Sequence, residues 1–183
     1  MHDTFSQCKH AWLTELRKQK GWMEHAFSQV PDAKIHQRCL PGVNPPSVII
    51  THVAGSMKSR FTDFLTTDGE KDWRNREAEF VIGNENREEL RTRWEAGWSV
   101  AFVSIEALTE SDVMRTVTIR AEPLNVAVAI TRAIGHCAYH TGQMMLICRS
   151  LAGTDNWQWA TIAPGKSAAF KDAMQEKFGK DSE

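Results

Sequence analysis

Hydrophobic side chains recur at helical spacing in four long stretches of the chain, and few segments alternate as an exposed strand would. In the first stretch Trp12, Leu16 and Met23 share one face, which predicts a helix over residues 4–29. Gly21 lies inside this helix and could mark a bend.

A second helix is predicted over residues 47–66. Pro45 and Pro46 lie at its start, where proline is favourable because the first turn of a helix has N–H groups without partners. The small residues at 54–56 would let another helix approach closely. A charged loop over residues 68–84 follows.

The third helix is predicted over residues 84–108, with Trp94 and Trp98 in its apolar stripe. After a short extended segment over residues 113–120, Pro123 is expected to open a fourth helix that continues to Leu151. An irregular tail then leads to a short last helix. The pattern therefore predicts a helical bundle in a single domain.

Composition excludes several classes of protein. The 183 residues carry a net charge of −1 with scattered lysine and arginine, so a nucleic acid is not an expected partner. The four cysteines form no Cys-x-x-Cys pair, which predicts buried free thiols in a reducing compartment. No apolar signal-peptide core occurs near the N-terminus, and prolines interrupt the uncharged stretch 39–57. A cytoplasmic protein without a membrane span is therefore expected.

Two histidines in the fourth predicted helix have the spacing of a chelating pair. His136 and His140 are four residues apart, so they lie on one face of the helix, one turn apart. This spacing alone is weak evidence, but the pair lies in a stretch without charged residues, where unpaired imidazoles are poorly solvated. Cys137 stands where a His-Glu-x-x-His metalloprotease has its glutamate, which excludes that pattern.

His52, in the second predicted helix, is the candidate third ligand. It too lies in an uncharged stretch, beside the small residues that permit close packing. Three neutral imidazoles favour zinc, nickel, iron or copper over magnesium and calcium. Three protein ligands would leave coordination positions open, as in catalytic zinc sites. The alternative for His52 is a core histidine bonded to a carbonyl group.

The chain also carries motifs of a known family. They are THVAGSMKSRFTDF at 51–64, TDGEK at 67–71, WRNR at 73–76, GHCAYHTGQ at 135–143 and PGKS at 164–167. Through them the chain resembles the DinB-like superfamily and, within it, the DUF1572 branch, over roughly residues 5–170. Two positions depart from the family pattern, because Ser56 replaces a common Asn and Cys137 replaces a frequent Tyr.

The resemblance implies an all-α fold: an antiparallel four-helix bundle of the DinB-like type, with a long loop between the second and third helices and a short C-terminal helix at 167–177. One domain would span residues 1–183, with the tail at 153–183. The resemblance also implies one divalent metal ion on His52, His136 and His140, and frequently a homodimer. Zinc is the first expectation for the ion, with nickel or iron as alternatives.

Other residues are candidates for roles around the ion. Tyr139 and Gln143 lie on or beside the histidine face and could orient a ligand or contact substrate. Arg60 and Asp63 follow His52 and are expected either to support the site or to form a buried pair.

The charged loop supplies three candidate contacts for an anionic substrate, namely Arg74, Arg76 and Trp73. For the arginines the alternative is a solvated ion-pair network with neighbouring glutamates. The loop is expected to cover a pocket between the second and fourth helices, and two aromatic residues, Trp73 and Phe80, are expected to pin it to the bundle.

The superfamily includes thiol-dependent transferases and metal-dependent hydrolases, so two enzymatic functions are implied. The sequence offers no obvious general base besides the histidine ligands, Asp63 and Tyr139. This favours transfer of a small thiol to an electrophile over hydrolysis of an amide, which needs a proton donor for the leaving group. A hydrolase and a non-catalytic, metal-stabilised ligand-binding or stress protein remain the alternatives. A small-molecule substrate and a small thiol are the expected partners.

The chain has seven tryptophans, and their side chains carry more apolar surface than one bundle buries easily. This independently predicts a homodimer, with Trp94 and Trp98 as the first candidates for the contact.

Overall fold

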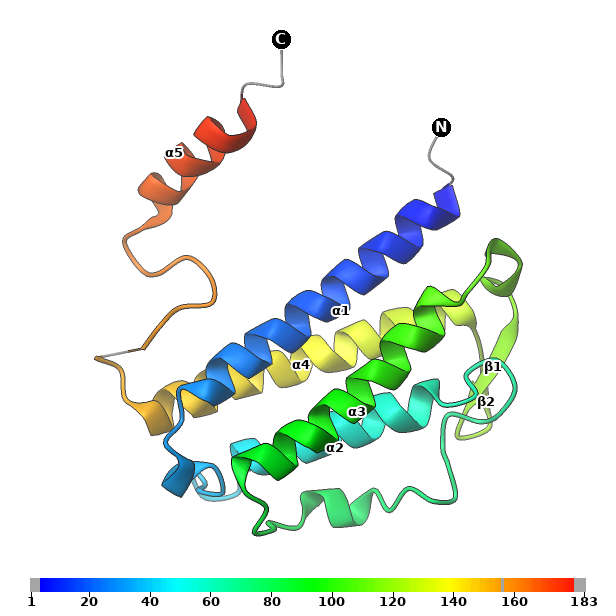
Figure 1. Ribbon diagram of the computed structural model, residues 1–183, viewed down its shortest axis with the longest axis horizontal. Helices are drawn as coiled ribbons and strands as arrows, with labels where there is room; N and C mark the ends of the chain where they lie inside the picture. Colours follow the sequence, from blue (N-terminus) through cyan, green and yellow to red (C-terminus); the bar gives the residue numbers. More distant parts are fainter. Residues whose placement is uncertain (1–3, 156, 180–183) are drawn as a thin grey trace.

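The computed structural model describes residues 4–155 and 157–179 of the protein (Figure 1). Within them the fold is mostly helical, with one small two-stranded sheet. The elements are α1 (Thr4–Ser28), η1 (Asp32–Lys34), α2 (Pro46–Phe61), η2 (Glu77–Phe80), α3 (Arg87–Glu106), η3 (Glu110–Asp112), β1 (Thr116–Ile119), β2 (Glu122–Asn125), α4 (Val126–Ala152) and α5 (Ser167–Phe178).

The four long helices pack side by side in two parallel pairs (Figure 1). In the pair α2 and α3, Thr51 lies beside Arg93, and ten residues later in α2 the carbonyl of Phe61 accepts a hydrogen bond from Ser104. Both contacts advance toward the C-terminal ends of the two helices, so the helices run in the same direction. In the pair α1 and α4, Lys34 just after α1 bonds the carbonyl of Leu151 at the end of α4. The expected antiparallel arrangement therefore holds for α1 with α2 and for α3 with α4, but is wrong for α2 with α3.

The parallel course of α2 and α3 explains the long connection between them. A chain that leaves the end of α2 must travel back along the molecule before it can start α3 in the same direction (Figure 1). Residues 62–86 make this return, with η2 as their one helical turn. Asn86 then caps α3: its side chain accepts hydrogen bonds from the N–H groups of Glu88 and Glu89, and the Glu89 side chain bonds back to Asn86.

The core lies among the four long helices and holds large apolar side chains that are almost completely buried. They include Leu16, Met23, Ile49, Met57, Phe61, Leu90, Trp98, Ile105, Ile130 and Met144. At Gly97 the backbones of α2 and α3 come so close that a Cβ atom would lie 2.9 Å from Ala54 Cα. The close approach predicted from small residues in the second helix is therefore confirmed.

Trp94 and Trp98 belong to this core. Their exposed fractions are 2% and 0%, and their rings contact each other edge to face with centroids 5.4 Å apart. Their side chains offer no surface to a second chain, so the specific suggestion that they form a dimer contact is wrong. Trp157 is buried as well, and Trp159 stacks on Arg149 at 4.4 Å, so both pack against the bundle.

A hairpin, rather than one extended segment, precedes α4. β1 and β2 pair antiparallel through a two-residue turn, Arg120-Ala121, whose φ angles of 55° and 62° are both positive. Pro123 lies in β2, and α4 begins only at Val126, capped by the Asn125 side chain. The expected helix start at Pro123 is therefore wrong. The usual Asn-Gly or Asp-Gly signal of such a turn is absent at these two positions.

α2 also differs from its predicted extent, because it ends at Phe61 rather than near residue 66. Thr62 adopts an extended conformation with ψ 126°, and Asp63 has a positive φ of 48°. The chain therefore leaves the helix axis there. α1, by contrast, is continuous through Gly21, so the suggested bend is not found.

α5 stands apart from the other helices (Figure 1). None of its residues is buried, and the side chains of Phe170, Met174 and Phe178 are exposed. Among the helices of the described chain, none has the length and apolar character needed to cross a membrane.

Candidate metal centre

Three histidines from two helices meet at the centre of the molecule. His52 comes from α2, and His136 and His140 come from successive turns of α4. The Nε2 atom of His136 lies 3.2 Å from the Nε2 atoms of both His52 and His140. All three ring nitrogens lie within 4.8 Å of one another, so they could hold a metal ion. The predicted triad is therefore brought together by the fold.

The outer nitrogens of two of these rings are bound to acceptors. His52 Nδ1 lies 2.9 Å from Glu79 Oε2, and His140 Nδ1 lies 2.8 Å from Gln143 Oε1. Because these oxygens accept, each Nδ1 carries the proton, and each Nε2 turns a lone pair toward the centre. His136 Nε2 carries at most one hydrogen, so it can donate to only one of the Nε2 atoms of His52 and His140. Without a cation, at least two of the three Nε2 atoms would direct lone pairs at each other.

Glu79 is held in place on both sides. Arg74 grips its carboxylate with Nε 2.8 Å from Oε1 and Nη2 2.9 Å from Oε2. Both side chains are buried, with exposed fractions of 3% for Arg74 and 10% for Glu79. On the side of α2 the residue is Gly55, where a Cβ atom would lie 2.9 Å from Glu79 Cδ and closer still to Oε1. Glycine therefore makes room for the carboxylate that orients His52.

The electrostatics keep two of the imidazoles, those of His136 and His140, ready to act as ligands. Burial and the neighbouring charges of His140 and His52 lower the pKa of His136 to about 3. Burial, followed by the charge of His52, lowers the pKa of His140 to about 4. Burial alone would raise the pKa of Glu79, but His52 and Arg74 outweigh it, so this pKa lies below its usual value. At neutral pH these groups are two neutral imidazoles and a carboxylate.

A cavity of about 340 Å³ adjoins the centre, at the small end of the range for ligand pockets. It lies between α2 and α4, as the sequence predicted, and the hairpin closes its far end. Its lining residues are His52, Ser56, Met57, Arg60, Phe61, Phe64, Arg74, Arg76, Ile119, Arg120, Glu122, Ala129, Arg132, Ala133 and His136.

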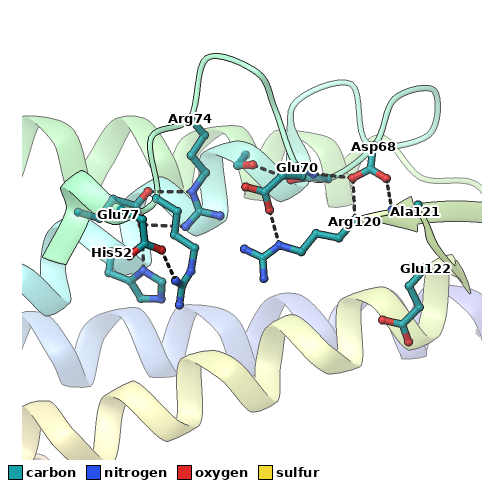
Figure 2. A network of polar contacts seen from close by, with 12 residues as sticks. His52, Asp68, Glu70, Arg74, Glu77, Arg120, Ala121 and Glu122 are labelled. Atoms are coloured by element: carbon teal, nitrogen blue, oxygen red, sulfur yellow. Dashed lines mark hydrogen bonds and ion pairs between the residues drawn. The ribbon is translucent and has the colours of Figure 1, made fainter.

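Charged side chains run along this cavity from the histidines to the hairpin. In Figure 2 His52 lies at one end of the row and Glu122 at the other, with Arg74 and Arg120 between them. Arg120 reaches back from the hairpin and donates to Glu70 at 2.7 Å, while Arg132 on α4 pairs with Glu122 at 2.7 Å.

The residues predicted to support the site lie at different distances from the histidines and the cavity. Gln143 bonds His140 and also donates to the Tyr139 hydroxyl at 3.0 Å, so both belong to the surroundings of the centre. Tyr139 is 63% exposed and lies outside the cavity lining. Arg60 lines the cavity, whereas Asp63 is exposed in the turn after α2. The structure shows no ion pair between Arg60 and Asp63, so the suggested buried pair is not found among the described residues.

Of the three predicted substrate contacts in the loop, two line the cavity and one does not. Arg74 and Arg76 line the cavity, but each has a glutamate partner, Glu79 and Glu77 respectively. Trp73 is 53% exposed and lies under the ammonium group of Lys58 at 5.3 Å. It neither lines the cavity nor anchors the loop in the core.

The second aromatic residue of the loop, Phe80, does contact the centre. Its ring lies 4.7 Å from that of His52, and the guanidinium of Arg76 lies over it at 4.8 Å.

No cysteine lines the cavity. All four cysteines are free; Cys137 and Cys148 are buried as expected, whereas Cys8 is exposed, which corrects the expectation for that residue. Cys137 packs on Met57 with the two sulfur atoms 3.7 Å apart, and burial raises the pKa of its thiol to about 12. Cys137 therefore stays protonated at neutral pH and points away from the histidines.

Comparison with family models tests the resemblance to known proteins. The model of the family described as "Protein of unknown function (DUF1572)" matches residues 6–166. The chain belongs to the DUF1572 family. The match agrees with the predicted extent of the resemblance, and the helical fold of this DUF1572 protein is consistent with the DinB-like superfamily. Comparisons with curated proteins and with solved structures give no match.

Three residues of the site in this DUF1572 protein were missed by sequence reasoning as functional. Glu79 was seen only as part of a charged loop, and nothing in the sequence pairs it with a histidine 27 positions earlier. Arg132 and Glu122 had a weak signal: Arg132 precedes His136 by four residues and so shares its helix face. Only the hairpin brings Glu122 to that face.

Proposed function

We propose that this protein is a metal-dependent enzyme that transfers a small thiol to an electrophile, with one divalent ion held by His52, His136 and His140. The fold would be a four-helix bundle of the DinB-like type. The observation that carries this proposal is the convergence of three Nε2 atoms, two of which have their opposite Nδ1 atoms fixed by Glu79 and Gln143.

The donor set fits a first-row ion. Metal–nitrogen bonds of about 2.0–2.1 Å in a tetrahedron separate the ligand atoms by about 3.3–3.4 Å. The two measured Nε2–Nε2 distances of 3.2 Å are close to this value. Zinc is the first choice for three imidazoles, with nickel and iron as alternatives, since geometry, ligand type and metal supply rather than raw affinity decide which ion such a site holds.

The hydrogen-bond partners of His52 and His140 support a bound ion. A histidine ligand in metalloproteins usually donates its other nitrogen to a carboxylate or a carbonyl, which fixes its orientation and increases its basicity. His52 with Glu79 and His140 with Gln143 follow this pattern. Such an ion would supply a position at which the pKa of a thiol or a water falls by several units.

The residues of the chain favour thiol transfer over hydrolysis. Hydrolysis of an amide needs a group that gives a proton to the leaving nitrogen. The pKa of Glu122, the one carboxyl group of the cavity lining, is held below its usual value by the hydrogen bond from Arg132. Because Glu122 stays ionised, it is a poor proton donor. The attacking thiol must come from a second molecule, since no cysteine lines the cavity.

Elemental analysis tests the ion. Protein made without an affinity tag that carries nickel should contain about one equivalent of metal per chain. His140→Ala should contain less than about a tenth of an equivalent and keep most of its helical circular dichroism, because the core packing is unchanged. His10→Ala, an exposed histidine on α1, is the matched control and should retain the ion. Wild-type protein without metal would contradict the proposal.

Cobalt substitution tests the thiol. Adding cysteine or glutathione to the cobalt protein should produce an intense near-ultraviolet band, and the same thiol should be consumed with 1-chloro-2,4-dinitrobenzene. Absence of both signals in protein that holds its metal would remove the transferase function and bring hydrolysis forward.

A further inference from the structure

We propose that the end of the cavity opposite the histidines binds the carboxylate of a small substrate with an apolar body, and that Arg60 is the residue that receives it. This inference deepens the proposed function, since it names the class of substrate that the same site would take.

The first support is the missing partner of Arg60. Its side chain lies in the cavity wall, and its Nη1 atom is buried with no hydrogen-bond partner. No ion pair or hydrogen bond reaches this guanidinium from the residues that the structure describes. A charged guanidinium without an acceptor is destabilising in a cavity wall, and its Nε and Nη2 atoms, which are not buried in this way, are the donors that a ligand could reach.

The second support is the charge balance of the cavity. Each of the other four lining arginines has a glutamate partner: Arg74 with Glu79, Arg76 with Glu77, Arg120 with Glu70 and Arg132 with Glu122. Among these five arginines, Arg60 alone has no carboxylate partner in the part of the chain that the structure describes. An anionic group of the substrate would supply one, and the two oxygens of a carboxylate match the fork of the guanidinium.

The third support is the arrangement along the two helices. His52, Ser56 and Arg60 are spaced by four residues, so they form one row on α2. At a rise of 1.5 Å per residue, Arg60 lies about 12 Å along the helix from His52. Figure 2 shows the hairpin end, with Asp68 and Glu122, at the opposite end of the polar row from His52. A molecule that touches both ends must therefore span several bonds.

Beside the charged row, part of the cavity wall is apolar. Met57 and Phe61 of α2, Phe64 of the turn after it, and Ala129 and Ala133 of α4 line this part. These side chains fit a hydrocarbon or aromatic body and offer it no hydrogen bonds. The substrate would thus place its carboxylate at Arg60, its apolar part in the middle and its reactive group toward the histidines.

Arg60 is positioned by its neighbours for this role. Its Cδ atom passes so close to Gly69 that a Cβ atom there would lie 3.2 Å away, and the same Cβ would lie 3.2 Å from Ile119 Cγ1. The backbone of Gly69 is itself bonded to Thr118 O at 2.8 Å. The turn after α2 and the hairpin therefore fix the course of the Arg60 stem.

Calorimetric binding of hexanoate and of its neutral match, hexanamide, tests the proposal on the metal-loaded protein. Wild-type protein should bind hexanoate at least about tenfold more tightly than hexanamide, the scale of a hydrogen bond to a charged group. Arg60→Met should reduce this ratio to less than about twofold, and Arg60→Lys should give an intermediate ratio, because ammonium lacks the fork of guanidinium. Arg91→Met, which changes an exposed arginine on α3, should leave the ratio unchanged.

Three results would overturn the proposal: equal binding or no binding of the two probes, a ratio that survives in Arg60→Met, or a ratio that disappears when only the metal is removed. The last result would mean that the carboxylate binds the ion held by the histidines rather than Arg60. The metal content is measured separately, so the two proposals can fail independently. If the wild-type protein contains metal but does not prefer hexanoate to hexanamide, only the carboxylate site is rejected. If the wild-type protein contains no metal, the proposed function is rejected, and the comparison of wild type with Arg60→Met is still made in the metal-free protein.

A second measurement covers the case in which Arg60→Met does not fold. In wild-type protein labelled with ¹⁵N, the Arg60 side-chain Nε–H signal should shift on addition of hexanoate and not of hexanamide. Arginine signals that stay unchanged at saturating hexanoate would contradict the proposal.

Discussion

The two ends of the cavity differ in how their polar groups are satisfied. At the histidine end His52 and His140 each have an acceptor on the outer ring nitrogen, and Glu79 is itself clamped by Arg74. At the arginine end the partners come from a return loop and a hairpin, and Arg60 keeps a buried atom without one. The histidine end is thus organised in advance for one fixed occupant, while the arginine end has a charge left for an occupant that comes and goes.

The difference also reflects the elements that supply the residues. The histidines sit on α2 and α4, which pack in the core and allow little adjustment. The arginine end depends on Asp68, whose carboxylate accepts the N–H groups of Arg120 and Ala121 at 2.8 Å each. One carboxylate therefore holds the turn of the hairpin against the loop after α2 (Figure 2).

The largest expected effect is at the histidine end. Glu79→Gln should lower metal affinity by about 10- to 100-fold, the usual result of removing an outer partner of a histidine ligand. The amide keeps the shape but loses the charge that pairs with Arg74 and orients His52. Competition with a chelator measures the affinity. Glu77→Gln, in an exposed pair with Arg76, is the matched control and should change the affinity less than about twofold. Equal effects of the two substitutions would remove the special role of Glu79.

At the other end, Asp68→Asn should destabilise the hairpin without affecting the ion. The Asp68 carboxylate accepts hydrogen bonds from three backbone N–H groups, and the substitution removes its charge. Because Asp68 is partly exposed to solvent, the free energy of unfolding should fall by only about 1–2 kcal/mol. Urea unfolding measures this change. Asp72→Asn, an exposed acid of the same loop, is the control. A loss of metal in Asp68→Asn would mean that the two ends are not independent.

The same carboxylate predicts a pH dependence. Burial alone raises the pKa of Asp68, but hydrogen bonds from Glu70, Ala121, Arg120 and Thr118 outweigh it, so its pKa lies well below the usual value. Because the folded pKa is below the unfolded one, the stabilisation is complete above about pH 5 and is lost as the pH falls. The difference in unfolding free energy between wild type and Asp68→Asn should therefore shrink below about pH 4. Measurements on metal-free protein avoid any contribution from metal release. A difference independent of pH would contradict this assignment.

The smallest expected effect is a shift in the position of Arg60. Gly69→Ala should displace the Arg60 stem and Ile119 by a few tenths of an ångström and lower the hexanoate-to-hexanamide ratio about two- to threefold, while the metal content stays the same. Gly21→Ala, in an open position of α1, is the control and should only stabilise the protein by about 0.5–1 kcal/mol. An unchanged ratio in Gly69→Ala would show that Arg60 adjusts freely.

The predicted homodimer stays a prediction, and light scattering at tens of micromolar tests it. With Trp94 and Trp98 buried in the core, a contact between two chains would have to use other residues.

Sequence alone determined the long helices and the histidine triad, because both follow from local periodicity. Spacing by four residues places His136 and His140 on one face whatever the rest of the chain does. The last helix, α5, was likewise expected from residue 167, and it begins there. His52 needed the added inference that its uncharged helix packs against theirs, and the structure confirms that α2 and α4 meet.

Tertiary structure decided everything that depends on chain direction and on pairings distant in sequence. α2 and α3 run parallel and touch at Gly97 and Ala54, and no periodicity reveals the relative direction of two helices. That course forces residues 62–86 to return along the molecule and so carries Glu79 to His52. Likewise the hairpin, whose turn lacks the usual glycine signal, brings Arg120 opposite Arg60. Helical spacing reports which residues share a face, but only the packed fold determines which faces meet and which charge is left without a partner.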